Sequence, residues 1–147
     1  MKRLIFLFFV FLFLVGCDFK SSKSSKVLEC NFNGNVGGTL SEQNYKVIFI
    51  NDHVDKLSVN INVSLGEPDD VTLNNLENDV NSAFEDYKNH KGVSYFSNIK
   101  DNGFGVSLDV DFNELSDEDK SSISLINSEK SYDEIKSEFE NDGFSCK

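Results

Sequence analysis

Two segments of the chain alternate strictly between apolar and polar residues, and this pattern limits the possible folds more than any other. The apolar positions are Leu57, Val59, Ile61, Val63 and Leu65 in the first segment, and Phe104, Val106, Leu108, Val110 and Phe112 in the second. Because successive side chains of a β-strand point to opposite faces, each set lies on one face of its strand. The pattern predicts an antiparallel sheet with one face on a core and the other in water.

Weaker periodic segments extend this sheet. Residues 28–32 alternate before the turn sequence Asn33-Gly34-Asn35, and residues 45–50 run into Asn51-Asp52. Together with residues 57–65, these segments predict a three-stranded meander. Residues 93–99 form a further expected strand, which Asn102-Gly103, a dipeptide that favours tight hairpin turns, joins to the strand at 104–112.

Helical periodicity separates the two groups of strands. One apolar face is formed at spacings of three or four by Leu73, Leu76, Val80, Phe84 and Tyr87. This spacing predicts one long helix that ends near Gly92. Further along, Ser116 and Ser131 each precede an acidic residue by three positions, as in a capping box, and predict two short helices.

The first seventeen residues are organised as an export signal. Lys2 and Arg3 precede the apolar run Leu4–Val15, which is too short to span a bilayer of about 30 Å. Leu14-Val15-Gly16-Cys17 resembles a bacterial lipobox, in which the cysteine becomes lipidated. We therefore expect lipidation of Cys17, with palmitate among its acyl chains, and a domain on the extracytoplasmic side of the cell membrane. An ordinary secretory peptide with a free Cys17 thiol and an uncleaved anchor are the alternatives.

These observations predict both the domain organisation and the fold class. Residues 1–17 are the expected lipoprotein signal peptide with its lipobox, residues 18–26 a Ser/Lys tether, and residues 27–147 a single α+β domain. The expected fold is an antiparallel sheet of about five strands packed on one long helix, with short C-terminal helices.

Cysteine usage fits an exported protein. With Cys17 lipidated, Cys30 and Cys146 remain, one near each end of the expected domain. Disulfides persist in extracytoplasmic compartments, so we expect these two residues to form one. Two buried free thiols and a redox-active pair are the alternatives.

The charge balance excludes one class of partner. The chain contains 14 Lys and Arg against 25 Asp and Glu, a formal net charge of −11, and loss of Lys2 and Arg3 with the signal makes the charge more negative. Nucleic acid is not expected as a partner, because phosphate binding needs clustered cations. The expected partners are the lipid bilayer, reached through acylated Cys17, and an envelope protein, a glycan or a cationic ligand.

One acidic segment begins like a calcium-binding loop. Residues 109–113 supply oxygen ligands at positions one, three and five, but position six is Glu114 instead of glycine and position twelve is Lys120 instead of glutamate. Asp109 and Asp111 are therefore weak candidates for divalent-cation binding, and no dedicated metal site is predicted. A simply solvated acidic strand face is the alternative.

No motif indicates catalysis. The only histidines are His53, in an expected turn, and His90, at the expected end of the long helix, and both are expected to be exposed and without a partner. No nucleotide-binding loop, nucleophile elbow or zinc-ligand spacing occurs, so neither catalytic residues nor cofactors are predicted. Chemistry by a pair of carboxylates stays open. Tyr95 and Phe96 must point to opposite faces of their strand, and we expect the C-terminal helices to cover the outer one.

Several phrases of the sequence together resemble a known family. Residues 49–56, 91–93 and 131–147 are similar to YehR-like small bacterial lipoproteins, for which no biochemical function is established. The resemblance implies an α+β lipoprotein and carries over no functional residue beyond Cys17. The sequence thus favours a membrane-anchored extracytoplasmic binding or interaction module. A weak cation-binding or sensing domain is the alternative, and a carboxylate-dependent enzyme is less favoured.

Overall fold

The computed structural model describes residues 24–36, 39–100, 102–123 and 125–147 of the chain. The expected signal peptide, Cys17 and most of the expected tether lie outside these residues. The strand β1 begins at Ser25, so the last two residues assigned to the tether belong to the sheet. Among the helices of the described part, none combines the length and the hydrophobicity needed to cross a membrane.

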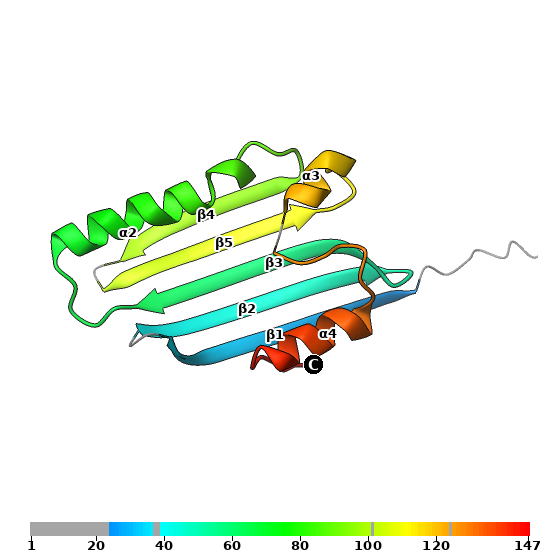
Figure 1. Cartoon of the computed structure of the whole chain (residues 1–147), viewed down its shortest axis with the longest axis horizontal. Coiled ribbons are helices and arrows are strands. Elements are labelled where there is room, and N and C mark those ends of the chain that lie inside the picture. Colours follow the sequence, from blue (N-terminus) through cyan, green and yellow to red (C-terminus); the bar gives the residue numbers. More distant parts are fainter. Residues whose placement is uncertain (1–23, 37–38, 101, 124) are drawn as a thin grey trace, which may run out of the picture.

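The described chain forms a six-stranded sheet and a set of short helices (Figure 1). The strands are β1 (Ser25–Val36), β2 (Thr39–Ile50), β3 (His53–Ser64), β4 (Val93–Lys100), β5 (Gly103–Asp111) and β6 (Ser145–Cys146). The helices are α2 (Asp70–Ala83), the 3₁₀ turn η1 (Glu85–Tyr87), α3 (Asp117–Ser122) and α4 (Tyr132–Asn141). The strand order is β4-β5-β3-β2-β1-β6, and every neighbouring pair is antiparallel.

The two alternating segments of the sequence occupy the middle of this sheet. In the register of β3 and β5, Leu57 faces Val110 and Val59 faces Leu108, and all four side chains are buried. The predicted meander is formed by β1, β2 and β3, and β4 and β5 form the second predicted hairpin. Gly103, expected in its turn, is the first residue of β5 and pairs with Lys100. Local periodicity therefore identified these strands correctly.

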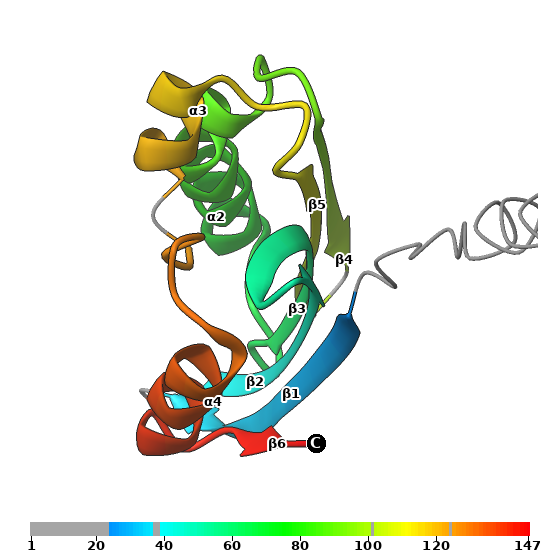
Figure 2. The same cartoon turned by 90° about the vertical axis from the view of Figure 1, so that its right-hand side faces the viewer.

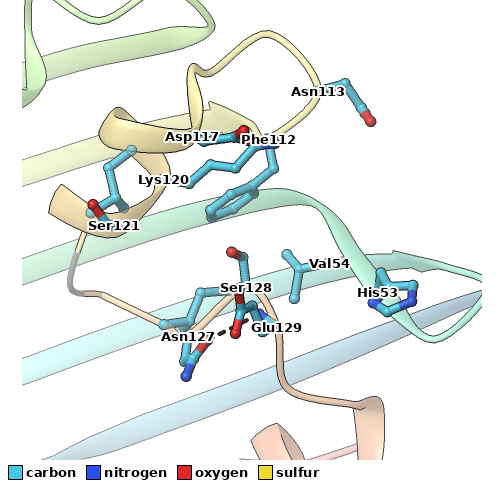
Figure 3. A pocket seen from close by; sticks show the side chains of 12 residues that line it. His53, Val54, Phe112, Asn113, Asp117, Lys120, Ser121, Asn127, Ser128 and Glu129 are labelled. Atoms are coloured by element: carbon cyan, nitrogen blue, oxygen red, sulfur yellow. Dashed lines mark hydrogen bonds and ion pairs between the residues drawn. The ribbon is translucent and has the colours of Figure 1, made fainter.

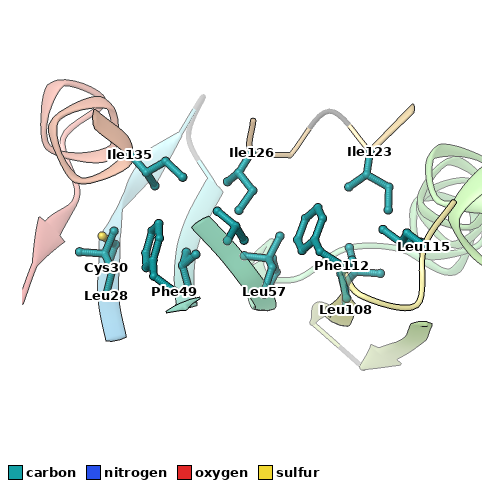
Figure 4. Close-up of a cluster of buried hydrophobic side chains, with 14 residues drawn as sticks. Leu28, Cys30, Phe49, Leu57, Leu108, Phe112, Leu115, Ile123, Ile126 and Ile135 are labelled. Atoms are coloured by element: carbon teal, nitrogen blue, oxygen red, sulfur yellow. The ribbon is translucent and has the colours of Figure 1, made fainter. Parts of the chain in front are cut away.

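The helices lie on one side of the sheet only (Figure 2). The core fills the space between this side of the sheet and the helical layer (Figure 4). Its helical and loop contributions are Ile135 of α4, Leu115 before α3, and Ile123 and Ile126 after α3, all of which are buried. A loop thus covers the middle of the sheet, and helices cover only its two ends.

The predicted fold class is wrong in two respects. The sheet has six strands instead of about five, and no long helix of the described residues packs across it. The helix α2 ends at Ala83, well before Gly92, and the chain continues as the separate turn η1. Within α2 only Val80 is buried, and the helix contacts the sheet along β4 at its edge. The expected apolar face is divided between α2 and η1, because the backbone leaves the α-helix at Phe84, which has φ −110° and ψ 7°. The ring of Phe84 stacks on Tyr95, with ring centroids 5.1 Å apart.

The sixth strand closes the sheet through a disulfide between Cys30 of β1 and Cys146 of β6. Glu29 and Lys147 exchange two backbone hydrogen bonds of 3.0 Å, which makes the adjacent cysteine pair a non-hydrogen-bonded one. Such pairs bring two Cα atoms closest together in an antiparallel ladder. The geometry of the ladder therefore places the two predicted partners within bonding reach, on the core side of the sheet.

The helix α4 attaches to this edge of the sheet through aromatic contacts. The ring of Tyr45 on β2 lies 4.8 Å from that of Phe139, and Phe49 lies 5.4 Å from Tyr132. The predicted capping box at the start of α4 is confirmed. The Ser131 side chain accepts from the Glu134 backbone amide, and the Glu134 side chain accepts from the Ser131 backbone amide. This docking fixes α4 over β1 and β2, at a distance from α2 and α3 (Figure 2).

Candidate ligand-binding groove

The gap in the helical layer leaves a groove of about 880 Å³ over the ends of β3 and β5 (Figure 3). One wall is α3, and the other is the segment 126–129 that leads to α4. Its apolar lining consists of Val54, Phe112, Ile123 and Ile126. Its polar lining includes His53, Asn113, Asp117, Lys120, Asn127 and Glu129.

The floor of the groove is part of the core. Val54, Phe112, Ile123 and Ile126 are all at most 9% exposed. Side chains in a close-packed core are held in place by their neighbours, so the floor is rigid. A ligand would meet this narrow apolar floor between two polar walls.

The first wall is positioned by the cap of α3. The Ser116 hydroxyl accepts a 3.1 Å hydrogen bond from the Asp119 amide, as the capping pattern in the sequence predicts. The carboxylates of the first turn are favoured there by the helix dipole. Lys120 pairs with Asp117 across 3.3 Å, so this wall presents an ammonium and a carboxylate side by side.

The second wall is a turn that Asn127 stabilises from within. The Asn127 side-chain oxygen accepts from the Glu129 amide at 3.0 Å, and its backbone oxygen accepts from the Lys130 amide at 3.1 Å. Asn and Asp commonly bond their own backbone in this way. The turn holds Ser128 and Glu129 at the rim, opposite α3 (Figure 3).

His53 lies at one end of the groove and is exposed, as predicted. It follows a tight turn in which Asn51 and Asp52 both have positive φ, of 52° and 66°. The Asp52 carboxylate accepts from Lys26 at 3.3 Å and from the Tyr132 amide at 3.4 Å. These contacts join the β2–β3 turn to β1 and to α4 and fix this end of the groove.

The second histidine has a partner, contrary to the sequence-based expectation. The Nδ1 atom of His90 lies 2.8 Å from an Asp119 carboxylate oxygen, and only 23% of the His90 side chain is exposed. The Ser116 hydroxyl and, less strongly, His90 lower the pKa of Asp119. The pair joins the turn before β4 to α3, and it is not part of the groove lining.

The weak cation candidates lie away from the groove. Asp109 and Asp111 are on the face of β5 opposite the core, where Asp109 accepts from the Ser58 hydroxyl and Asp111 pairs with Lys56 at 2.7 Å. The hydrogen bond from Lys56 lowers the pKa of Asp111, and the same bond raises the pKa of Lys56. Each carboxylate therefore already has a donor. Within the described residues, no group of three or more His, Cys, Asp or Glu side chains could hold a metal ion.

Tyr95 and Phe96 point to opposite faces, as predicted, but the outer one is not covered. Tyr95 lies toward the core, and its buried hydroxyl has no hydrogen-bond partner in the described part of the chain. Phe96 is 63% exposed, because the helices of the described part of the chain lie on the other side of the sheet. The expectation that the C-terminal helices cover it is wrong.

Most of the groove residues carried no signal in the sequence. In the sequence, His53 lies in an expected turn and Lys120 occupies a position unsuited to a calcium loop. No motif contains Asn127 or Glu129. The lining comes from segments that are far apart in the chain. The local signals near it were the helix cap at Ser116, the alternation that includes Phe112, and the calcium-like segment that includes Asn113.

Comparison with known proteins supports a statement about the fold alone. No protein-family model and no curated protein matches the chain. Among solved structures, an NMR structure of a Streptococcus pneumoniae TIGR4 protein is similar with a TM-score of 0.59 and 11% identity, over 86% of this chain and 87% of that one. The NMR structure of Escherichia coli YehR is similar with a TM-score of 0.55 and 18% identity, over 85% of this chain and 92% of that one. The chain therefore has a YehR-like fold.

Proposed function

We propose that this protein is a lipid-anchored binding module on the extracytoplasmic side of a bacterial membrane, with the groove between α3 and residues 126–129 as its ligand site. The observation that carries the proposal is the groove itself. Its volume of about 880 Å³ is in the range of ligand-binding clefts. Its combination of an apolar floor and a few polar groups is also typical of such sites.

The chemistry of the rim favours an extended segment of an envelope protein as the ligand. Lys120 and His53 offer donors, whereas Asp117 and Glu129 offer acceptors, so both signs of charge are present. A peptide backbone carries donors and acceptors at regular intervals and can use both walls. Apolar side chains of the same segment would contact the floor at Phe112.

A site-specific photo-crosslinker tests the groove in the membrane-bound protein. We expect a crosslinking residue at Ser128, on the rim, to give a discrete product that the substitution Lys120→Glu reduces. The matched control is a crosslinker at Ser82, which is exposed on α2 outside the groove. Equal products from both positions, or a Ser128 product that is insensitive to Lys120→Glu, would contradict the proposal.

The anchor is tested separately at Cys17. The lipobox Leu14-Val15-Gly16-Cys17 supports this part of the proposal. Each methylene group of an acyl chain that is buried in the bilayer contributes about 0.8 kcal/mol to membrane binding. Cys17→Ala should leave an unprocessed precursor without label from radioactive palmitate. Cys146→Ala is the matched control and should be labelled like the wild type. Normal processing and labelling of Cys17→Ala would refute the lipobox interpretation.

The alternative, weak divalent-cation binding at Asp109 and Asp111, has less support. Both carboxylates lie on the same face of β5, but a cation at Asp111 would have to displace the ammonium of Lys56. Titration calorimetry with calcium or magnesium tests it. If the wild type releases or absorbs no heat with millimolar cation, the alternative is removed. Heat of binding that the substitution Asp109→Asn abolishes would support it.

A further inference from the structure

The side of the sheet that faces away from the helices is here called the open face (Figure 2). Two neighbouring cross-strand rows of this face are almost free of charge. In the order β1, β2, β3, β5, β4, the first row is Asn31, Asn44, Asn60, Ser107 and Phe96. In the same order, the second row is Asn33, Glu42, Asn62, Gly105 and Asn98.

The composition of these rows is unusual for strands. Asparagine is depleted in β-sheets, yet it fills most of the two rows. Apart from Glu42, the charged residues of the open face lie in other rows, where Glu29 pairs with Lys46 at 3.3 Å and Asp111 pairs with Lys56. The sheet therefore presents an amide-rich area beside a separate ion-paired area.

A hollow of about 150 Å³ lies at the β4 end of the amide-rich area. Its lining includes Asn60, Asn62, Phe96, Asn98, Lys100 and Gly105. The absence of a side chain at Gly105 opens the hollow, because a Cβ atom there would lie 3.2 Å from the Asn62 side-chain oxygen. Phe96 forms one border, and 63% of its surface is exposed.

The hydrogen bonds in the hollow leave donors for a ligand. The Ser107 hydroxyl donates to the Asn60 side-chain oxygen at 2.7 Å, and the Lys100 ammonium donates to the Asn62 side-chain oxygen at 2.9 Å. With both amide oxygens used, the NH₂ groups of Asn60 and Asn62 remain as donors. An exposed aromatic ring, amide donors and an ammonium thus surround one small depression.

The charges of the hollow restrict its ligand. Among the residues that the structure describes, the lining contains the cation Lys100 and no carboxylate, so it does not suit a cationic ligand. The net charge of −11 repels an extended polyanion from the molecule as a whole. An uncharged ligand with many hydrogen-bonding groups and one apolar face fits this lining of amides, an ammonium and an exposed ring, and these are the properties of a sugar ring.

We propose that this hollow binds one unit of a neutral saccharide chain. The C–H face of the sugar packs on Phe96, and its hydroxyls accept from Asn60, Asn62 and Lys100. The rest of the saccharide follows the asparagine rows toward β1, about 19 Å away at the usual strand spacing. The site is independent of the groove, which lies on the other side of the sheet.

NMR titration of the isotope-labelled full chain, as processed by the expressing cell, tests the proposal. The probes are cellohexaose and chitohexaose as neutral saccharides and hexagalacturonate as an acidic one. We expect at least one neutral hexasaccharide, at millimolar concentration, to shift the backbone amides of Asn98, Gly105 and Ser107. No shift with either neutral probe, a response to the acidic probe alone, or shifts at groove residues such as Ser128 instead would overturn it.

Two variants and one matched control locate the site. Phe96→Ala should weaken binding about tenfold, the usual cost of losing an aromatic anchor. Gly105→Ala should weaken it as well, because the added methyl group occupies the hollow. Leu40→Ala removes another exposed apolar side chain of the open face, 57% exposed, and should leave the affinity unchanged. Equal affinities of Phe96→Ala and the wild type would contradict the proposed site.

Discussion

Removal of the Cys30–Cys146 disulfide should cost the domain a large part of its stability. The two cysteines are 116 positions apart, so the bond closes a loop that contains almost the whole described chain. In the chain-entropy model a loop of this length stabilises the folded state by about 5 kcal/mol, because it restricts the unfolded chain. For a domain of this size the melting temperature would fall by roughly 15 to 25 °C.

Urea unfolding of the oxidised protein and of the double variant Cys30→Ala/Cys146→Ala measures the effect. Reduced wild type lacks the disulfide but keeps both cysteine side chains. It is therefore the control for the volume that the alanine substitution removes at Cys30, which is fully buried. The dependence of the free energy of unfolding on urea should be steeper without the disulfide, since the unfolded chain then exposes more surface. A loss below about 2 kcal/mol, with an unchanged slope, would refute the entropic explanation.

Three further substitutions test individual contacts. Tyr95→Phe should leave the melting temperature unchanged or raise it, because the buried Tyr95 hydroxyl has no hydrogen-bond partner among the described residues and its burial is uncompensated. A clear fall in melting temperature would show that the hydroxyl does have a partner. Gly103→Ala should lower the free energy of unfolding by about 2 kcal/mol or more, since the Cβ atom of the alanine would lie 1.9 Å from the Val63 carbonyl oxygen. A variant as stable in urea as the wild type would show that the backbone at this contact can move apart without cost. Asp111→Asn should make the free energy of unfolding depend less on pH at acid pH. Lys56 lowers the pKa of Asp111 below 3.8, so the stabilisation by the Asp111 carboxylate is present above that pH and is lost as the pH falls further. Parallel acid unfolding curves for the variant and the wild type would contradict this.

The strands could be predicted because their signal is local. Alternation along residues 57–65 and 104–112 reports directly which side chains face the core, and β3 and β5 are found there. The strand β6 was not predicted, because its two residues are too few to show a period. Its place depends on the register with β1, which the sequence reveals only through the spacing of two cysteines.

The helical layer was predicted less well, for a physical reason. Apolar spacing shows that Phe84 and Tyr87 are partly buried, but it does not show whether the helix is continuous up to them. The structure buries them from a separate turn. Likewise Leu115 and Ile126, which cover the middle of the sheet, lie in loops and follow no period that a sequence pattern could detect.

The groove could not be predicted because it results from this incomplete layer. Its walls come from α3 and from the turn at Asn127, and only their packing on the same sheet brings them together. The open face was more accessible to sequence reasoning. Alternation placed Phe96 opposite Tyr95, and the remaining uncertainty was which of the two faces the helices would cover.

The disulfide also has a consequence for how the protein matures. Under the proposed export, Cys30 would enter an oxidising compartment well before Cys146, which follows 116 positions later. The sequence has three cysteines, so Cys17 is the one other thiol of the chain that Cys30 can meet during this interval. Under the proposed lipidation the sulfur of Cys17 carries a thioether and cannot take part in thiol–disulfide exchange. The modification that anchors the protein would then also ensure that Cys30 waits for its correct partner.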